Sequence, residues 1–314
     1  MDTNSNQARR VVIGITAHVD AGKTTLAEAM LYRTGRLRKL GRVDHGSAAM
    51  DSHLLERERG ITIFSSQAEL PIGDLEVTLL DTPGHVDFSA EMERTLSVLD
   101  YAILVISGAD GIQAHTRTLW RLLELYRIPT FLFVTKMDFG RCGRGQMMEH
   151  LRHELGEGCV DFTPADRERR MEQLATCRED ALEAYLDGGE VPDALVRQLV
   201  FPCWFGSGLK LEGIDEFLEG LARYVEPPAY PAAFSARVFK ISHDPQGKRL
   251  THLKVTGGTL RVRDAVPYAG HQEKAAQLQQ KYEGRLEEVT DRFMAGLEDA
   301  NDDFLKEKKL YLAQ

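Results

Sequence analysis

One segment constrains this chain more than any other: Ala-His-Val-Asp-Ala-Gly-Lys-Thr-Thr at residues 17–25. It follows Val11 to Ile15, a short apolar run whose β-branched residues predict a buried strand. A loop between a strand and a helix can turn its backbone amides and the positive helix N-terminus toward one anion. Lys23 would reach the terminal phosphates of a nucleotide, and the Thr24 hydroxyl would bind Mg²⁺. The residues expected to line this phosphate loop are His18, Val19, Asp20, Ala21, Gly22, Lys23, Thr24 and Thr25.

Two further segments supply groups for a metal and a γ-phosphate. Arg-Gly-Ile-Thr-Ile at residues 59–63 offers a second hydroxyl ligand, Thr62. Asp-Thr-Pro-Gly-His at residues 81–85 follows the apolar run Val77 to Leu80, which places Asp81 at a strand's carboxyl end, where open α/β sheets bind ligands. Asp81 would hold Mg²⁺ through a water molecule, and the Gly84 amide would contact the γ-phosphate.

Two segments nearer the C-terminus predict recognition of a guanine base. Thr135, Lys136 and Asp138 follow the apolar run Phe131 to Val134. The Asp138 carboxylate can accept hydrogen bonds from guanine N1–H and the 2-amino group, donors that adenine does not present together. A loop that would cradle the base is formed by Gly206, Ser207 and Gly208.

With these motifs together, the sequence resembles the translational GTPases, nearest to elongation factor G and the tetracycline-resistance ribosomal protection proteins. The likeness extends over about residues 10 to 270, and His85 after Pro-Gly is more specific than the phosphate loop. The resemblance implies that His85 positions the attacking water and that Val19 and Ile61 form an apolar gate beside it. It also implies that Asp20 helps to bind a monovalent cation or supports the histidine. Thr135 departs from the family, which usually has asparagine there.

Other function classes remain open on the sequence alone. A P-loop kinase or ATPase shares the phosphate loop, but it would not need Asp138 in this setting. A non-catalytic module would bind GTP or GDP and use a terminal helix for protein interaction.

Composition and charge are those of a cytoplasmic enzyme. A chain of 314 residues exceeds one typical core, so two domains are expected. No apolar stretch is long enough for a membrane span, residues 1–10 lack a signal core, and the four cysteines are too widely spaced for a zinc site. The net charge of −9 argues against bulk binding to DNA. Contact with ribosomal RNA and proteins is expected from the family, and a basic cluster for it is Arg33, Arg36, Arg38, Lys39 and Arg42.

The order of apolar and amphipathic segments predicts an α/β fold with a doubly wound, mostly parallel sheet over residues 1–228. A helical insertion is expected at about residues 141–199, where strand-like runs are missing. The proline-rich segment 226–231 then predicts a domain boundary. Residues 229–271 resemble the opening of the family's β-barrel second domain, with strands at Phe234 to Ile241 and Leu250 to Thr256. For residues 272–314, apolar positions spaced by three and four predict an amphipathic helix in place of the strands that would close the barrel.

Overall fold

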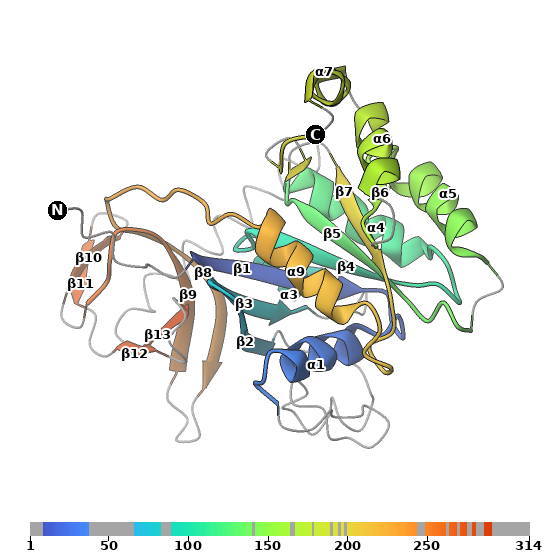
Figure 1. Cartoon of the computed structure of the whole chain (residues 1–314). Helices are drawn as coiled ribbons and strands as arrows, with labels where there is room; N and C mark the ends of the chain where they lie inside the picture. The colour runs from blue at the N-terminus through green and yellow to red at the C-terminus, as the bar shows by residue number, and fades with distance from the viewer. Residues whose placement is uncertain are drawn as a thin grey trace, which may run out of the picture. The chain divides into compact units, whose positions relative to one another are not determined.

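The computed structural model describes residues 9–37, 66–82, 89–139, 142–163, 167–177, 179–188, 191–193, 196–197, 200–243, 249–261, 264–268, 271–274, 278–280 and 286–290. The chain divides into two compact units, Met1–Pro228 and Ala229–Gln314 (Figure 1). Each unit is described by itself.

Among its described residues, the first unit is built on a seven-stranded sheet with the order β2-β3-β1-β4-β5-β7-β6. All neighbouring strands run parallel except β2, which pairs antiparallel with β3 at one edge. The strands are β1 (Arg9–Ala17), β2 (Ser66–Ile72), β3 (Leu75–Asp81), β4 (Tyr101–Ser107), β5 (Thr130–Thr135), β6 (Cys159–Asp161) and β7 (Phe201–Phe205). This is the predicted doubly wound α/β sheet.

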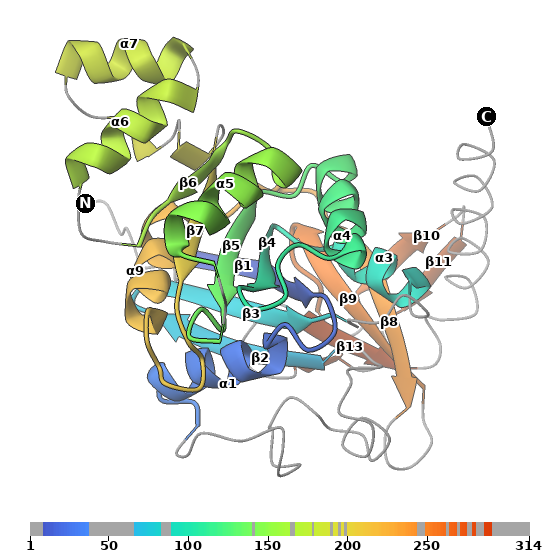
Figure 2. The ribbon, with the colours of Figure 1, turned by 90° about the vertical axis from the view of Figure 1, so that its right-hand side faces the viewer.

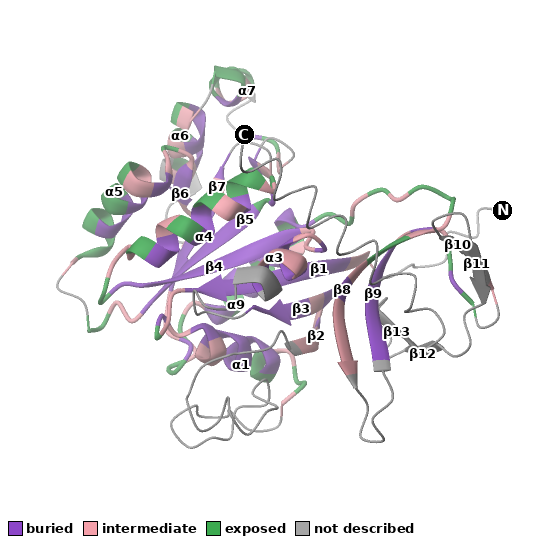
Figure 3. Ribbon diagram, turned by 180° about the vertical axis from the view of Figure 1, so that it is seen from behind, coloured by how far each residue is buried: buried purple, intermediate pink, exposed green. Residues whose placement is uncertain are grey.

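Helices cover both faces of this sheet. They are α1 (Lys23–Arg33), α3 (Ser89–Leu96), α4 (Ala114–Leu125), α5 (Arg144–Leu155), α6 (Arg167–Cys177), α7 (Glu179–Gly188) and α9 (Ile214–Tyr224). α1 and α9 pack on one face, and α3, α4 and α5 pack on the other (Figure 2). Alternate residues of β4 serve the two cores: Ile103 and Val105 face α1 and α9, whereas Leu104 and Ile106 face the opposite helices. The central strands are therefore buried on both sides, while α4 to α7 keep exposed outer faces (Figure 3).

Two strands of this sheet were missed by the sequence prediction. β2 forms a hairpin with β3 through the two-residue turn Gly73-Asp74, in which Gly73 has φ +61°. β6 lies inside the segment expected to form a helical insertion, and it adds to the sheet beside β7. α5 also packs on the main sheet through Met147, Met148, Leu151 and Leu155. The helices that depart from the regular alternation are therefore α6 and α7, and the bounds of the helical insertion, about residues 141–199, stay a prediction.

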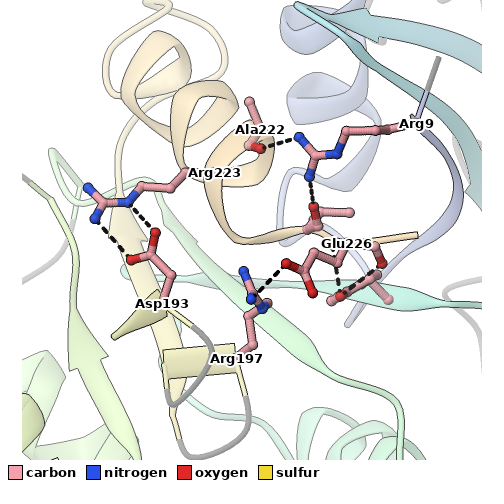
Figure 4. Close-up of polar contacts among 8 residues, drawn as sticks. Arg9, Asp193, Arg197, Ala222, Arg223 and Glu226 are labelled. Atoms are coloured by element: carbon pink, nitrogen blue, oxygen red, sulfur yellow. Dashed lines mark hydrogen bonds and ion pairs between the residues drawn. The ribbon is translucent and has the colours of Figure 1, made fainter. Parts of the chain in front are cut away.

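The last residues of the first unit are held by a cluster of polar contacts (Figure 4). Arg9, at the start of β1, donates to the carbonyl oxygens of Ala222 (3.2 Å) and Val225. The Tyr101 hydroxyl, at the start of β4, accepts from the Glu226 amide and donates to its carbonyl oxygen, at 3.1 and 3.2 Å. Arg197 forms an ion pair with the Glu226 carboxylate at 2.8 Å. The segment that leaves the sheet domain is thus bonded to the amino ends of two central strands.

In the described part of the second unit, the strands form an antiparallel four-stranded sheet with the order β12-β13-β9-β8 and a separate pair, β10 with β11. Its strands are β8 (Ser235–His243), β9 (Arg249–Gly257), β10 (Ala265–Tyr268), β11 (His271–Lys274), β12 (Leu278–Gln280) and β13 (Leu286–Thr290). β8 and β9 confirm the two strands predicted from the sequence.

The predicted C-terminal helix is wrong for the described residues between 271 and 290, which form strands. β13 pairs antiparallel with β9 over five residues, from Leu286 opposite Lys254 to Thr290 opposite Leu250. An exposed strand edge offers unpaired backbone groups, and pairing with it outweighs a local helical periodicity. Residues 291–314 of the predicted helix lie outside the described part of the chain.

Candidate functional site

The phosphate loop connects the end of β1 at Ala17 to the start of α1 at Lys23. A turn is closed by the Ala21 amide donating to the His18 carbonyl at 3.1 Å. Gly22 precedes the helix with φ +91°, a left-handed conformation that L side chains rarely adopt. Within the described part of the chain, no side chain caps α1, and its first turn holds no acidic residue. Its first amides and positive dipole end therefore suit an anion.

Lys23 and Asp81 meet at the carboxyl edge of the sheet. The Lys23 ammonium forms an ion pair with Asp81 Oδ1 and donates to the Thr82 carbonyl oxygen at 2.7 Å. Both side chains are buried, and Asp81 is 0% exposed. Thr82 is fixed in turn, because its amide and hydroxyl both donate to the Ile15 carbonyl, at 3.1 and 2.9 Å. The structure thus brings a cation and a carboxylate from two distant motifs to one point.

The base-reading loop is bonded to the phosphate loop at two places. The Thr135 hydroxyl lies 2.6 Å from the Ala21 carbonyl oxygen and 3.3 Å from that of Ile106. The Lys136 ammonium donates to the Asp20 carbonyl oxygen at 2.5 Å. Thr135 stands where the family usually has asparagine, and its hydroxyl joins the two loops.

Unusual backbone conformations gather in these loops. Among the described residues, four non-glycine residues have positive φ, and three of them lie here: Asp20 (61°), Lys136 (55°) and Leu211 (59°). Such conformations cost about 1–3 kcal/mol and persist only where surrounding contacts enforce them, which is typical of binding sites. The bond from Lys136 to Asp20 is one such contact, because it joins two of these residues directly.

The loop expected to cradle the base packs on the first turn of α1. A Cβ added at Gly208 would lie 2.9 Å from the Thr25 carbonyl oxygen, so glycine allows this close approach. Ser207 and Glu212 exchange backbone hydrogen bonds of 2.9 and 3.0 Å, which close the loop. From it, Lys210 reaches the carboxylate of Asp138, with 2.6 Å between Nζ and Oδ2. The sequence motifs did not point to Lys210, because only the fold shows that its loop faces Asp138.

The remaining predicted site residues have mixed placement. Val19 is half-buried and Asp20 is exposed, so neither belongs to the hydrophobic core. Thr24 and Thr25 lie in the first turn of α1, and both are half-buried. Four predicted residues, Ile61, Thr62, Gly84 and His85, lie outside the described residues.

The basic cluster predicted for ribosomal RNA has part of its charge paired within the protein. Arg33 forms an ion pair with Asp215 at 3.0 Å, and Arg36 forms one with Glu69 at 2.8 Å. Arg38, Lys39 and Arg42 lie outside the described residues.

The site combines three features that define a P-loop GTPase. These are a phosphate loop, a buried carboxylate at the end of the neighbouring strand β3, and a loop positioned to read a base. The model of the elongation factor Tu GTP binding domain matches residues 8–227. The chain therefore belongs to this family, the translational GTPases.

Named relatives agree with this family. The chain is 39% identical over 287 residues to the oxytetracycline resistance protein of Streptomyces rimosus, a match that covers 81% of this chain and 43% of the relative. It is 32% identical over 320 residues to the tetracycline resistance protein TetM of Ureaplasma urealyticum, covering 94% of this chain and 50% of the relative. A crystal structure of a Thermus thermophilus protein superposes with a TM-score of 0.77 at 26% identity, over 91% of this chain and 53% of that one. The chain spans about half the length of these proteins.

Proposed function

We propose that this chain binds GTP with Mg²⁺ and hydrolyses it to GDP and phosphate while bound to the ribosome. The observation that supports this best is the double connection of the base-reading loop to the phosphate loop, Thr135 to Ala21 and Lys136 to Asp20. One nucleotide can contact both loops only if their spacing is fixed, and these bonds fix it. A GTPase has this requirement, because its specificity lies in the base and its chemistry in the phosphates.

Nucleotide binding follows from the charges around the loops. The first amides of α1 would receive the β-phosphate, and Lys23 would turn from Asp81 toward the terminal phosphates. Asp138 would accept the two donors of the guanine edge, while Gly206, Ser207 and Gly208 would enclose the base. Thr135 and Lys136 would keep these contacts in register.

The residues present fit the expected Mg²⁺. Mg²⁺ is usually held by one or two protein oxygen ligands together with phosphates and water, and when bound it neutralises charge on the transferred phosphoryl group. Thr24 supplies a hydroxyl in the first turn of α1, and Asp81 supplies a carboxylate at the end of β3. Thr62 is the third proposed ligand. Asp81 is released for this role when Lys23 moves to the phosphates.

Hydrolysis requires an oriented water molecule. We assign that role to His85, with Val19 and Ile61 as the apolar gate that restrains the histidine until a partner docks. Val19 is partly exposed in the phosphate loop, which leaves its side chain available for this gate. Asp20, exposed in the same loop, is our candidate to support the histidine or to bind a monovalent cation.

The ribosome is the proposed partner because the chain belongs to the translational GTPases and its named relatives are tetracycline resistance proteins. A ribosomal partner places the chain in the cytoplasm. The alternative, a binding module that works through a C-terminal helix, loses support because residues 271–274, 278–280 and 286–290 form strands.

Base specificity is tested with Asp138→Asn. Asparagine can donate to the 2-oxo group of xanthine, where aspartate would repel it, so preference should shift from GTP to xanthosine triphosphate. Competition of labelled GTP by ATP, measured in parallel, separates a GTPase from a kinase or ATPase. An unchanged ratio of GTP to xanthosine triphosphate affinity in the variant would contradict the assignment.

Catalysis is tested by GTP turnover with and without ribosomes. We expect ribosomes to accelerate turnover, and His85→Ala to abolish the acceleration while leaving GTP affinity within a few-fold of the parent, because a water-orienting group acts mainly on the transition state. Lys23→Ala is the contrasting variant, since it should weaken GTP binding itself. Turnover that ignores ribosomes would favour the binding-module alternative.

A further inference from the structure

Lys210 lies outside every motif that assigns function to this chain, yet it contacts the residue expected to read the base. Its ammonium lies 2.6 Å from Asp138 Oδ2, with the two side chains 49% and 31% exposed. The pair is therefore open to solvent, from which a nucleotide base would approach the loop. An isolated surface lysine would sample many positions, so the question is what holds this one in place.

The loop around Lys210 has a fixed shape. The Lys210 amide donates to the Ser207 hydroxyl at 3.3 Å, inside the turn that the Ser207 and Glu212 backbones close. A Cβ at Gly206 would overlap the Glu212 carbonyl oxygen, which shows how tightly the turn is packed. Leu211 has φ +59°, a conformation that only a constrained loop maintains. The backbone from which the lysine extends is thus set by the loop.

The ion pair leaves Asp138 able to bind a base. A carboxylate has two oxygens with about four lone-pair sites, and Lys210 pairs with Oδ2. The guanine edge needs two of these sites. A charge-assisted bond from a lysine on a fixed loop restricts rotation of the carboxylate without using all of its acceptor capacity.

We propose that Lys210 is a positioning residue for guanine recognition: it orients the Asp138 carboxylate toward the two donors of the base. This inference rests on the proposed function, because it takes Asp138 as the base reader. The hydrogen bond from Lys210 also lowers the pKa of Asp138, and Asp138 in turn raises the pKa of Lys210, so both groups keep their charges near neutral pH. The lysine therefore affects nucleotide affinity through another residue.

The test combines Lys210→Met, Lys210→Arg and Asp138→Asn with calorimetric titration of GDP and xanthosine diphosphate into the full chain. Loss of an exposed ion pair is expected to weaken GDP binding about twofold to fivefold in Lys210→Met, and Lys210→Arg should restore it. In the Asp138→Asn background the aspartate charge is gone, so adding Lys210→Met should leave xanthosine diphosphate affinity unchanged. A lysine that only supported the loop would weaken both nucleotides in both backgrounds.

Different results would reject the assignment of Asp138 and the role of Lys210. If Asp138→Asn gains no affinity for xanthosine diphosphate, the assignment of Asp138 is wrong and the role of Lys210 is rejected with it. If Asp138→Asn gains that affinity while Lys210→Met binds GDP like the parent, only the role of Lys210 is rejected. An equal loss of both nucleotides in both backgrounds also rejects it, in favour of a structural role.

Discussion

Thr135 shows how one residue can depart from a family pattern and keep part of its role. Asparagine would offer an amide to both the guanine base and the phosphate loop. The threonine hydroxyl lies 2.6 Å from the Ala21 carbonyl and preserves the loop contact. Threonine therefore has no amide to offer a base, but its hydroxyl still bonds the base-reading loop to the phosphate loop.

Two substitutions at Thr135 should change affinity in opposite directions. Thr135→Val keeps the shape but takes this donor away from the Ala21 carbonyl, so we expect about 1–3 kcal/mol weaker GDP binding. Thr135→Asn restores an amide and should strengthen binding about fivefold. Calorimetric titration with GDP measures both, and Thr118→Val, which removes an exposed hydroxyl bonded within α4, is the control. If Thr135→Val bound GDP with the affinity of the parent, the bond from Thr135 to Ala21 would not contribute to GDP binding.

The Asp138 and Lys210 pair also predicts a pH dependence. In the proposed site, guanine binding requires an ionised Asp138. The hydrogen bond from Lys210 holds the pKa of Asp138 below its ordinary value. Glu212 also acts on this pair, because its charge adds to that of Asp138 in raising the pKa of Lys210. Because the folded pKa of Asp138 is depressed, its ionised form persists as pH falls and is lost only below its ordinary titration range.

Lys210→Met should therefore lose GDP affinity at a higher pH than the parent. Fluorescence titration with a labelled GDP from about pH 7 down to about pH 4, which spans the ordinary range of a carboxyl group, measures this shift. Arg117→Met is a matched control: Arg117 likewise lowers the pKa of its partner Glu154, 2.5 Å away, but this pair joins α4 to α5. Coincident pH profiles for Lys210→Met and the parent would show that the lysine does not influence the titration of Asp138.

At the scale of elements, α9 packs closely against the sheet at Gly220. A Cβ added at Gly220 in this helix would overlap the ring of buried Trp204 on β7. Helix propensity favours alanine over glycine by about 1 kcal/mol, but overpacking costs about 1–3 kcal/mol. At Gly220 the cost of overpacking should therefore exceed the gain in helix propensity.

We expect Gly220→Ala to lower the free energy of unfolding by about 1–2 kcal/mol. Gly145→Ala is the matched control in α5, because no atom of the described residues lies within 4 Å of its added Cβ, and it should stabilise the protein by about 0.5 kcal/mol. Urea unfolding followed by circular dichroism gives both values. A stabilised Gly220→Ala would mean that α9 can shift away from Trp204 at little cost.

The sequence predicts strands whose own residues carry the signal, and it misses strands that depend on pairing with a distant segment. β1, β3, β4, β5 and β7 were predicted because strands buried on both faces read as continuous apolar runs. β2 and β6 lie at the two edges of the sheet, and β13 is held by its pairing with β9, so their formation depends on a distant strand. Motifs likewise placed Asp81, Thr135 and Asp138, whereas Lys210 could be found only after the fold brought its loop to Asp138.

At the scale of the molecule, the boundary at Pro228 predicts an independent GTP-binding unit. The sheet, both of its helical faces and all described site residues belong to residues 1–228. A fragment ending at Pro228 should fold, bind GDP within about twofold of the full chain, and unfold in urea with an unchanged midpoint for that unit. Calorimetry and urea titration of both proteins provide the comparison. A fragment that aggregates or binds GDP about tenfold more weakly would show that residues 229–314 are needed for the site.

The polar cluster around Arg9 and Tyr101 has a mechanical consequence. It attaches the departing segment at Val225 and Glu226 to the amino ends of β1 and β4, whereas the phosphate loop begins at the carboxyl end of β1. A strand advances about 3.3 Å per residue, so the nine residues of β1, eight steps from first to last, span about 26 Å between these points. Both neighbours of β1 are hydrogen-bonded to it, which makes it stiff along its axis. β1 is therefore a direct connection, paired on both sides, between the phosphate loop and the residues where the chain leaves the sheet.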